Sequence, residues 1–460
     1  MMPLHEKIEV ERSARDCFRY LADFSTSEQW DPGVYRAAKV TAGAPAVGSE
    51  FELLLQSAGR RLPMRYCIEE LETDRRIVLR GQGDGFSAFD TISIEPLSAD
   101  SARIDYRAEI TFHGPASHIE PLLSPWLNRV GRQAVAGLQR ALTPQPPQPP
   151  GMLSRIGQRL ILPGAWSFTE RGYLAMPDKG LSEFVDGRTY VITGPTSGIG
   201  LASACQLARL GGRLLLVGRD PERLARAMAE IRDFSGCAND KVICLDAELS
   251  LLSEVDRISQ EIYYHAPRID GLINNAGALF AERDETTEGN ERALAINLLS
   301  PWFLTRELLP ALRQAGGRVI NVASGGMYLQ PLHLDDMQYQ QGPYDGSKAY
   351  ARAKRALVAV TEHWAQTITD VDFHSMHPGW AATPGVARSL PAFNRRLGKW
   401  LRDSRMAADT IVWLATSSAV AGDSGRFWFD RRPRPTAMLP GTAVSAAERD
   451  ALIEWLDSCP

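Results

Sequence analysis

A strand, a glycine-rich turn and a helix follow one another between residues 188 and 208, and this run constrains the fold more than any other stretch. The apolar residues Tyr190–Ile192 suit a buried strand of a parallel sheet. Glycines follow at the spacing Gly-x-x-x-Gly-x-Gly, at Gly194, Gly198 and Gly200. Glycine lets the backbone approach a diphosphate closely, and a helix N-terminus offers N–H groups and the positive end of a dipole. The run therefore predicts a phosphate-binding turn for a dinucleotide cofactor.

The chain has 460 residues, which is enough for two domains with separate cores. Its formal net charge of −4 gives no reason to expect a nucleic-acid partner. The 6 cysteines show no Cys-x-x-Cys pair and no metal-ligand spacing, so we predict reduced thiols and no metal site. The N-terminus lacks the regions of a secretory signal, and no apolar run has the length of a membrane span. These features predict a soluble, cytoplasmic protein.

The first 142 residues consist of short alternating segments. A strand is predicted over residues 4–12, and Ser13 is the predicted cap of the short helix that follows. Further strands are predicted over residues 51–55, 64–71, 76–80, 89–94 and 103–112, and a turn over 81–85. A long helix is predicted from Pro115 to about Leu142.

This order of elements and the stretch 17–32 resemble the helix-grip fold of the SRPBCC superfamily of polyketide cyclases and START-like lipid-transfer proteins. The resemblance implies an α+β domain over residues 1–142, whose long helix closes a cavity for an apolar ligand against a curved sheet. The residues leave a second interpretation open, in which the apolar side chains simply fill the core. A third interpretation is a cyclase or dehydratase, but its candidate residues form no recognisable constellation: His5, Asp31, His113, His118 and Glu120.

Residues 143–151 are rich in proline, a composition that favours a stiff, extended spacer. We interpret this spacer as the domain boundary, followed by a connecting segment over 152–186. Residues 152–162 fit a short basic amphipathic helix. Such a helix either contacts a membrane surface or packs on its own domain, and we favour packing at this length.

The glycine turn and its flanks resemble the first motif of the short-chain dehydrogenase/reductase family, and further motifs of that family follow up to residue 430. The resemblance implies a Rossmann domain over residues 187–460, an α/β fold with a doubly wound parallel sheet. It also implies cofactor contacts from the first motif, at Thr193, Gly194, Thr196, Ser197, Gly198, Ile199 and Gly200.

The residues after the second and third strands of this domain bear on the choice of cofactor. Arg219 follows the predicted strand 213–218, with Asp220 just beyond it. A carboxylate at the strand end binds the ribose of NAD, whereas a cation suits a 2′-phosphate, so Arg219 favours NADP over NAD. Asp246 follows the strand 241–245 and resembles the family's aspartate that contacts the adenine ring.

Four later motifs complete the resemblance. After the fourth strand, Asn274 and Asn275 have a primarily structural role, bridging neighbouring strands. The resemblance adds cofactor contacts at Asn275, Ala276, Gly277, Pro378, Gly379 and Thr383. It also makes Asn297 the active-site asparagine. Ser324, after the fifth strand, becomes the hydrogen-bond donor to the substrate oxygen.

The Tyr-x-x-x-Lys pair occurs twice, as Tyr344 with Lys348 and as Tyr350 with Lys354. The apolar stripe Leu357, Thr361, Trp364 and Ile368 should face the sheet. Tyr350 lies roughly 20° and Lys354 roughly 60° from Leu357 around the helix, whereas the earlier pair would fall near the opposite face.

Ser347 is a plausible cap of this helix, which leaves Tyr344 in the preceding loop. The predicted catalytic pair is therefore Tyr350 and Lys354. The run 344–354, with residues 168–173 and 324–328, resembles the branch of SDR family member 12 and the retinol-dehydrogenase-like reductases. The insertion between 327 and 343 is either a lid over the substrate or a plain surface loop.

Together these features predict an NADP(H)-dependent oxidoreductase that interconverts a carbonyl and an alcohol. In this hypothesis Tyr350 exchanges the proton, Ser324 holds the oxygen, and Lys354 lowers the pKa of the phenol and binds the ribose. Asn297 holds a relay water. The fused helix-grip domain points to an apolar or lipid-like substrate, and family resemblance implies a homo-oligomer. The alternative is a lipid-binding protein whose reductase domain senses NADP without catalysis.

Overall fold

The computed structural model describes residues 2–57, 60–114, 120–143, 167–176, 179, 182–389 and 391–459. These fall into two compact units, one containing the described residues up to 143 together with residue 179, and one containing residues 167–176 and those from 182 onward. Three sequence predictions lie outside the described residues: the spacer beyond Thr143, the helix over 152–162 and the helix start at Pro115.

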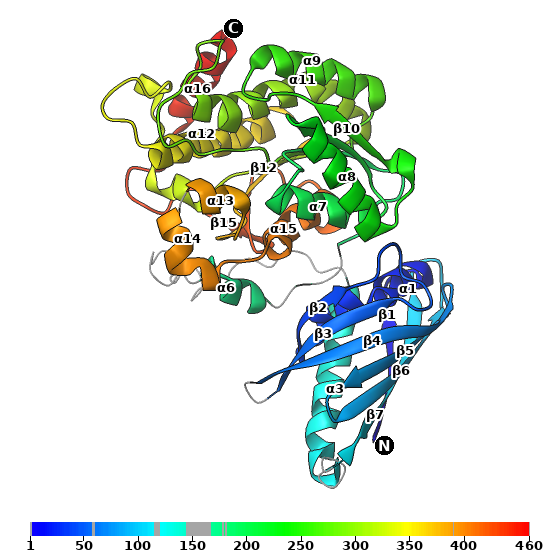
Figure 1. The fold of residues 1–460 in the computed structure, drawn as a ribbon. Helices are drawn as coiled ribbons and strands as arrows, with labels where there is room; N and C mark the ends of the chain where they lie inside the picture. The colour runs from blue at the N-terminus through cyan, green and yellow to red at the C-terminus, as the bar shows by residue number, and fades with distance from the viewer. Residues whose placement is uncertain are drawn as a thin grey trace. The chain divides into compact units, whose positions relative to one another are not determined.

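The first unit is a seven-stranded antiparallel sheet with a long helix, in the strand order β1-β7-β6-β5-β4-β3-β2 (Figure 1). Its elements are β1 (Met2–Val10), α1 (Ala14–Ala22), η1 (Phe24–Thr26), α2 (Ser27–Trp30), β2 (Val34–Lys39), β3 (Glu50–Ser57), β4 (Arg60–Glu72), β5 (Arg76–Gly83), β6 (Phe86–Pro96), β7 (Ala102–Phe112) and α3 (Glu120–Leu142). This is the helix-grip arrangement that the sequence predicted.

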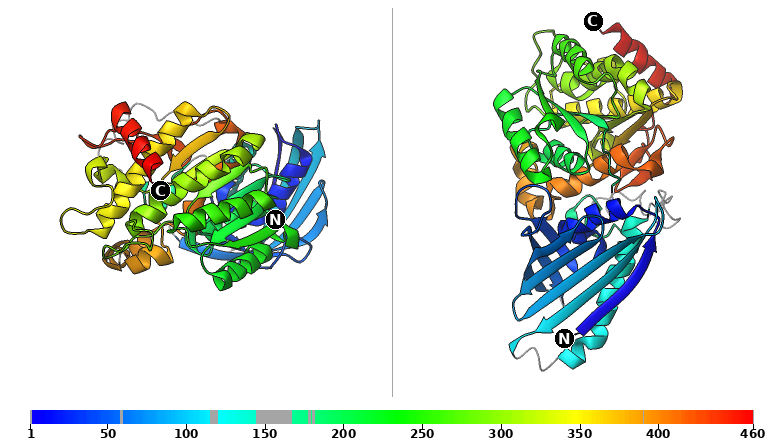
Figure 2. Two further views of the ribbon diagram at one scale, coloured as in Figure 1. Left: turned by 90° about the horizontal axis from the view of Figure 1, so that it is seen from above. Right: turned by 90° about the vertical axis from the view of Figure 1, so that its right-hand side faces the viewer.

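Buried and exposed residues alternate along the strands of this unit, and the buried face forms its core. Along β6 the inward-facing residues include Ala88, Asp90 and Ile92, which share the buried face with Leu138 and Leu142 of α3. The views in Figure 2 show α3 along one side of the sheet. The predicted turn over 81–85 is wrong at its start, because β5 continues to residue 83 with antiparallel pairing on both sides. The strand β2 was not predicted as a separate element.

The second unit contains an eight-stranded sheet flanked by helices. Its first half comprises α6 (Glu170–Leu174), β8 (Thr189–Thr193), α7 (Gly198–Arg209), β9 (Arg213–Gly218), α8 (Pro221–Ser235), η3 (Asn239–Lys241), β10 (Val242–Asp246), α9 (Leu252–His265), β11 (Gly271–Asn274), α10 (Arg292–Leu294), the π-helix η4 (Ala295–Leu299) and α11 (Ser300–Ala315). The second half comprises β12 (Arg318–Val322), η5 (Gly325–Leu329), η6 (Leu334–Asp336), α12 (Gly346–Thr367), β13 (Asp372–Met376), α13 (Pro384–Ser389), α14 (Pro391–Leu397), η7 (Gly398–Trp400), α15 (Ser404–Thr416), η8 (Ser418–Val420), β14 (Phe427–Phe429), β15 (Arg432–Arg434) and α16 (Ala446–Ser458).

The strand order is β10-β9-β8-β11-β12-β13-β14-β15, parallel up to β14, with β15 antiparallel at the edge. Helices α9, α11 and α12 bury their apolar faces on one side of the sheet, and α7, α8 and α15 lie on the other (Figure 1). The order reverses between β8 and β11, so the carboxyl ends of these strands flank the crevice where doubly wound folds bind ligands. The fold is therefore the predicted Rossmann arrangement, and among the strands of this sheet only β15 was not predicted.

Within the described ranges, none of the helices combines the length and the apolar character needed to cross a membrane. The same residues contain no group of His, Cys, Asp and Glu that could hold a metal ion.

Candidate active site

The glycine turn between β8 and α7 has the backbone shape that a diphosphate requires. Gly194 and Gly198 adopt left-handed φ angles of 65° and 58°. A Cβ on Gly200 would lie 2.2 Å from the carbonyl oxygen of Gly194, so a side chain there would fill the turn. Ser197 caps α7 without a side-chain hydrogen bond, which leaves the first N–H groups of the helix to a ligand. These residues fit the phosphates of a dinucleotide.

Asn275 and Thr193 join the ends of β11 and β8. The Asn275 amide donates to the carbonyl oxygens of Thr193 (2.9 Å) and Gly194 (3.1 Å). In return, Thr193 Oγ1 accepts from the backbone N–H groups of Asn275 (3.0 Å) and Ala276 (2.9 Å). Asn274 is buried and donates to Asn321 Oδ1 at 2.9 Å. Both asparagines therefore fix the strand ends beside the glycine turn.

Other residues predicted to contact the cofactor lie around this turn. A Cβ on Gly198 would lie 3.2 Å from Thr383 Cγ2, which places Thr383 beside the turn. The methyl carbon of Thr196 would likewise lie 3.6 Å from a Cβ on Gly218, which places Thr196 beside the end of β9. Pro378 and Gly379 follow β13, the latter with a φ of 82°. Ile199 lies half-buried in the first turn of α7.

Two predicted cofactor residues lie at the ends of neighbouring strands. Arg219 follows β9, and its guanidinium lies 3.3 Å from a carboxylate oxygen of Glu248 in a solvent-exposed pair. Asp246 is the exposed last residue of β10, the strand that pairs with β9. Asp220 has a structural role, because its carboxylate caps α8 by accepting from the N–H of Arg223 (3.0 Å). Arg219 is thus the cation nearest the end of β9 in sequence.

Ser324, Tyr350 and Lys354 come together at the carboxyl edge of the sheet. Ser324 lies just after β12, where its hydroxyl accepts from the N–H of Gly326 (3.2 Å) and lies close enough to the Tyr350 phenol to lower the pKa of that phenol. Tyr350 lies in the first turns of α12, and Lys354 follows one turn later with its Nζ 5.8 Å from the centre of the phenol ring. The apolar stripe of α12 faces the core as expected.

Asn297 lies beside this pair in the π-helix η4. Its amide donates to the carbonyl oxygens of Ala293 (2.7 Å) and Ala278 (2.8 Å), and the side chain is buried. A Cβ on Gly277 would lie 2.7 Å from Asn297 Oδ1 and 3.4 Å from Lys354 Nζ. Gly277 therefore leaves open the space where the asparagine and the lysine meet. π-Helical turns of this kind are frequent at functional sites.

Burial dominates the electrostatics of the pair. It lowers the pKa of the Lys354 ammonium to about 7. It also raises the pKa of the Tyr350 phenol, which the hydrogen bond from Ser324 partly offsets. The sequence hypothesis expected the lysine, together with the cationic nicotinamide of the oxidised complex, to lower the pKa of the phenol. In the protein alone that pKa is raised, because desolvation of the phenolate outweighs the other contributions.

The alternative tyrosine has different surroundings. Tyr344 lies in the loop before α12, and its hydroxyl donates to Glu291 Oε1 at 2.8 Å. Burial and this carboxylate raise its pKa. The predicted helix cap at Ser347 is wrong: the carboxylate of Asp345 caps α12 by accepting from the N–H groups of Ser347 (2.9 Å) and Lys348 (3.1 Å).

The insertion between residues 327 and 343 packs on its own domain. Leu332, Leu334 and Met337 contact the main core, and Tyr339 is buried. The Arg283 guanidinium donates to the carbonyl oxygen of Tyr339 (3.0 Å). These contacts agree better with a packed surface loop than with a lid that opens.

The candidate catalytic residues of the first unit remain scattered. His5 lies 2.9 Å from Asp105, His113 lies 3.0 Å from Ser87, and Asp31 accepts from the N–H of its neighbour Gly33. His118 and the side chain of Glu120 lie outside the described residues. Sequence reasoning did not single out Asp90, whose buried carboxylate accepts from Tyr106 at 3.0 Å. Asp90 could have been found from the sequence, because it is an acidic residue at an inward-facing position of a strand with alternating apolar residues.

Each of the two units matches a known protein family. Residues 188–392 match the profile of the family described as short chain dehydrogenase, and residues 1–143 match "Polyketide cyclase / dehydrase and lipid transport". The Bos taurus protein named dehydrogenase/reductase SDR family member 12 is 41% identical over 304 residues, which cover 64% of this chain and 94% of that protein. Retinol dehydrogenase 14 of Mus musculus is 32% identical, covering 53% of this chain and 78% of its own. Polyprenol dehydrogenase of Mus musculus is also 32% identical, covering 53% and 76%.

The doubly wound sheet, the glycine turn and the serine, tyrosine and lysine at its carboxyl edge define an NAD(P)-dependent oxidoreductase. The chain belongs to the short-chain dehydrogenase/reductase family, with a polyketide cyclase-like domain at its N-terminal end.

Proposed function

We propose that this protein is an NADP(H)-dependent reductase that interconverts a carbonyl and an alcohol on an apolar, lipid-like substrate. The observation that carries the proposal is the convergence of the Ser324 hydroxyl and the buried ammonium of Lys354 on the Tyr350 phenol. Two hydroxyls held in this way can bind one substrate oxygen between them.

The reaction follows from these groups. When bound, NADPH supplies the hydride that adds to the carbonyl carbon. Tyr350 donates its proton to the carbonyl oxygen as the oxygen gains charge, while Ser324 donates a hydrogen bond to the same atom. In the reverse direction Tyr350 takes the proton of the alcohol. The buried Lys354 ammonium stabilises the phenolate that forms, and its pKa of about 7 lets it pass on a proton near neutrality.

Asn297 supports proton return to the site through a relay water. Both hydrogens of its amide are already donated, to Ala278 and Ala293. A water at this position would therefore contact an oxygen of Asn297 and the ammonium of Lys354, which both lie near the position that a Cβ on Gly277 would take.

Arg219 supports NADP as the cofactor. It is the cation at the end of β9, where a 2′-phosphate lies in this type of site. Its partner Glu248 is a carboxylate in an exposed pair, which contributes little stability and leaves the guanidinium able to turn toward a phosphate.

The apolar substrate is supported by the relatives and the fused domain. Two relatives carry the names of retinol and polyprenol, which are apolar alcohols. The N-terminal domain resembles lipid-transport proteins, and we propose that it holds an apolar ligand. Mass spectrometry of apolar molecules that co-purify with residues 1–142 tests this, and a clean spectrum would favour a packed core. The free cysteines further support a reducing compartment such as the cytoplasm.

The decisive experiment compares two tyrosine variants of the full chain. Purified protein is given NADPH with decanal or all-trans-retinal, and oxidation of NADPH is followed. Tyr350→Phe should lose activity by at least about a hundredfold while NADPH still binds. Tyr344→Phe is the matched control and should keep its activity. Loss in the control alone would refute the assignment, whereas binding without turnover in the unaltered chain would favour the NADP-sensing alternative.

A further inference from the structure

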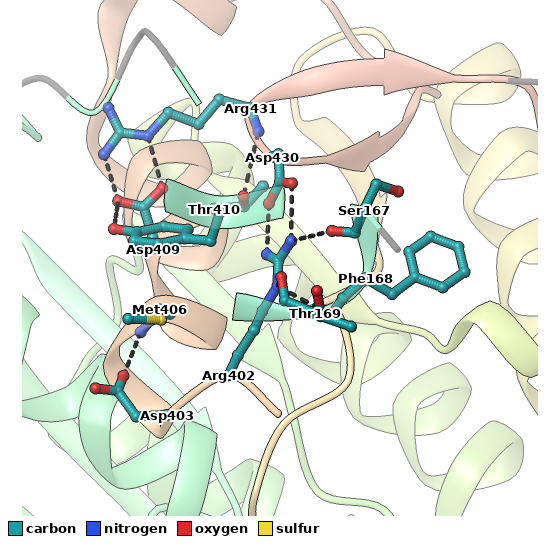
Figure 3. A network of polar contacts seen from close by, with 11 residues as sticks. Ser167, Phe168, Thr169, Arg402, Asp403, Met406, Asp409, Thr410, Asp430 and Arg431 are labelled. Carbon is teal, nitrogen blue, oxygen red and sulfur yellow. Dashed lines mark hydrogen bonds and ion pairs between the residues drawn. The ribbon is translucent and has the colours of Figure 1, made fainter. Parts of the chain in front are cut away.

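A buried arginine lies where several distant segments of the second unit meet. Arg402 is 1% exposed, and its guanidinium pairs with the Asp430 carboxylate through two contacts of 2.5 and 2.9 Å (Figure 3). Such a two-pronged pair fixes the plane of the guanidinium. Because both groups are buried, removal of either would leave the other charge uncompensated.

The remaining donors of Arg402 hold a short segment ahead of the first strand of the sheet. Nε donates to the carbonyl oxygens of Phe168 (3.1 Å) and Thr169 (3.2 Å), and Nη2 donates to that of Ser167 (2.7 Å). Figure 3 shows the three residues around the guanidinium. We call residues 167–169 the anchor segment. One side chain from far along the chain therefore contacts all three residues of this segment.

The anchor segment is also bonded to the turn after β13. The N–H of Trp380 donates to the carbonyl oxygen of Phe168 (2.8 Å), and the N–H of Arg402 donates to that of Trp380 (2.8 Å). A Cβ on Gly379 would lie 2.4 Å from Arg402 Nε, and Gly379 has a φ of 82°. The turn therefore lies directly against the arginine, and glycine is required there on both counts.

The ring of Phe168 continues these contacts toward Ser324. It packs edge-on against His377, with ring centres 4.6 Å apart, and Phe429 stacks on His377 at 5.2 Å. His377 Nδ1 accepts from the N–H of Gly325 (3.2 Å), the residue after Ser324. Burial and nearby cations hold the pKa of His377 at about 3, so the ring is neutral and Nδ1 is free to accept.

We propose that Phe168 and Arg402 are positioning residues for the reductase reaction: through His377 they hold Ser324, and through direct contacts they hold the turn at Pro378 and Gly379, where cofactor contacts are predicted. The catalytic unit then begins at the anchor segment, ahead of residue 188 where the dehydrogenase profile begins to match. This inference rests on the proposed function for its effect on rate, but its effect on local order is independent of that function.

The first test measures amide hydrogen exchange in the full-length protein without cofactor. Phe168→Ala should speed exchange in residues 324–329 and 377–382 by about tenfold, because without the ring two hydrogen-bond acceptors are less firmly held: His377 Nδ1, which accepts from Gly325, and the carbonyl oxygen of residue 168, which accepts from Trp380. Phe168→Tyr keeps the ring and should restore slow exchange. Arg402→Lys keeps the charge but not the fork of donors, and should give an intermediate result.

Arg318→Ala is the matched control. Its half-buried guanidinium also donates to backbone carbonyls, those of Leu414 (2.9 Å) and Ser417 (2.6 Å), but at the amino end of β12, away from the site. The control should leave exchange in residues 324–329 and 377–382 unchanged. Unchanged exchange in Phe168→Ala, or equally fast exchange in the control, would overturn the proposal.

The second test measures NADPH-dependent reduction of decanal. In Phe168→Ala, kcat should fall by about tenfold to a hundredfold while KM for NADPH stays within about threefold, because the glycine turn that binds phosphate is untouched. A wild-type kcat in this variant would contradict the positioning role. If the unaltered protein does not turn over, the proposed function fails for this substrate, and the exchange experiment alone decides the positioning role.

Discussion

At the scale of single residues, two tyrosines with the same spacing to a lysine differ in what their hydroxyls meet. Tyr344 donates to the carboxylate of Glu291, and a negative neighbour makes the phenolate costlier still. Tyr350 meets the hydroxyl of Ser324 and the ammonium of Lys354, neither of which opposes a developing negative charge. Burial raises the pKa of both phenols, but of the two only Tyr344 also faces a carboxylate, so we assign the general acid of the proposed reaction to Tyr350.

Arg219 gives a prediction about cofactor choice. Arg219→Ala should raise the Kd of NADPH by about tenfold and leave that of NADH within about twofold, because only NADPH carries the 2′-phosphate. Titration of the nucleotide fluorescence measures both values. Arg226→Ala removes an exposed positive charge from α8 and serves as the control. Equal weakening of both nucleotides would show that the guanidinium does not read the phosphate.

At the scale of elements, the start of α12 decides where Tyr350 and Lys354, the proposed catalytic pair, point. The Asp345 carboxylate caps this helix, and Tyr350 follows in its first turns. Asp345→Ala should lower the free energy of unfolding by about 1 kcal/mol and reduce kcat, since fraying moves the phenol. Ser347→Ala should change neither. Urea unfolding and NADPH oxidation check both, and the opposite ranking of the two variants would restore Ser347 as the cap.

The elements that the sequence predicted are those with local signals. The strand, glycine turn and helix at 188–208 follow from neighbouring residues, and so does the phase of α12. The cap of α12 was misplaced by two residues because Asp345 and Ser347 are both good capping types. The pattern of apolar residues does not distinguish between them.

The contacts that the sequence did not predict join distant segments. Arg402 meets carbonyls that lie more than 200 residues earlier, and no spacing rule connects them. The residues of β15 are two arginines and a proline, which do not predict a strand. They form one because β14 offers a free edge for pairing. Asp90 was recognisable as an inward position, but its partner Tyr106 depends on the pairing of β6 with β7.

At the scale of the whole chain, the described residues form two main cores that share no residue. One includes Val10 and Leu142, and the other runs from Val191 to Leu456. Cores built separately unfold separately unless an interface couples them. We therefore expect two calorimetric transitions, and this remains a prediction together with the boundary at 143–151.

The buried carboxyl of Asp90 provides a way to assign one of these transitions. Burial raises its pKa from 3.8 to about 7, and the hydrogen bonds from Tyr106 and Tyr66 only partly offset this. The folded state therefore binds a proton more tightly than the unfolded state between about pH 4 and pH 7. Stability of the first unit should fall as pH rises through this window and then level off. Burial raises the pKa of Asp31 as well, so it adds to the slope at the acid end.

Asp90→Asn keeps an acceptor for Tyr106 but cannot ionise. Calorimetry of the full chain at pH 5 and pH 7.5 should therefore show a smaller pH shift of one transition than in the unaltered protein, with the other transition unmoved. Arg318→Ala should lower the other transition, because its guanidinium holds carbonyls in the core of the second unit. A single transition that responds to both variants would mean that the two cores unfold as one, and the proposed boundary would then be wrong.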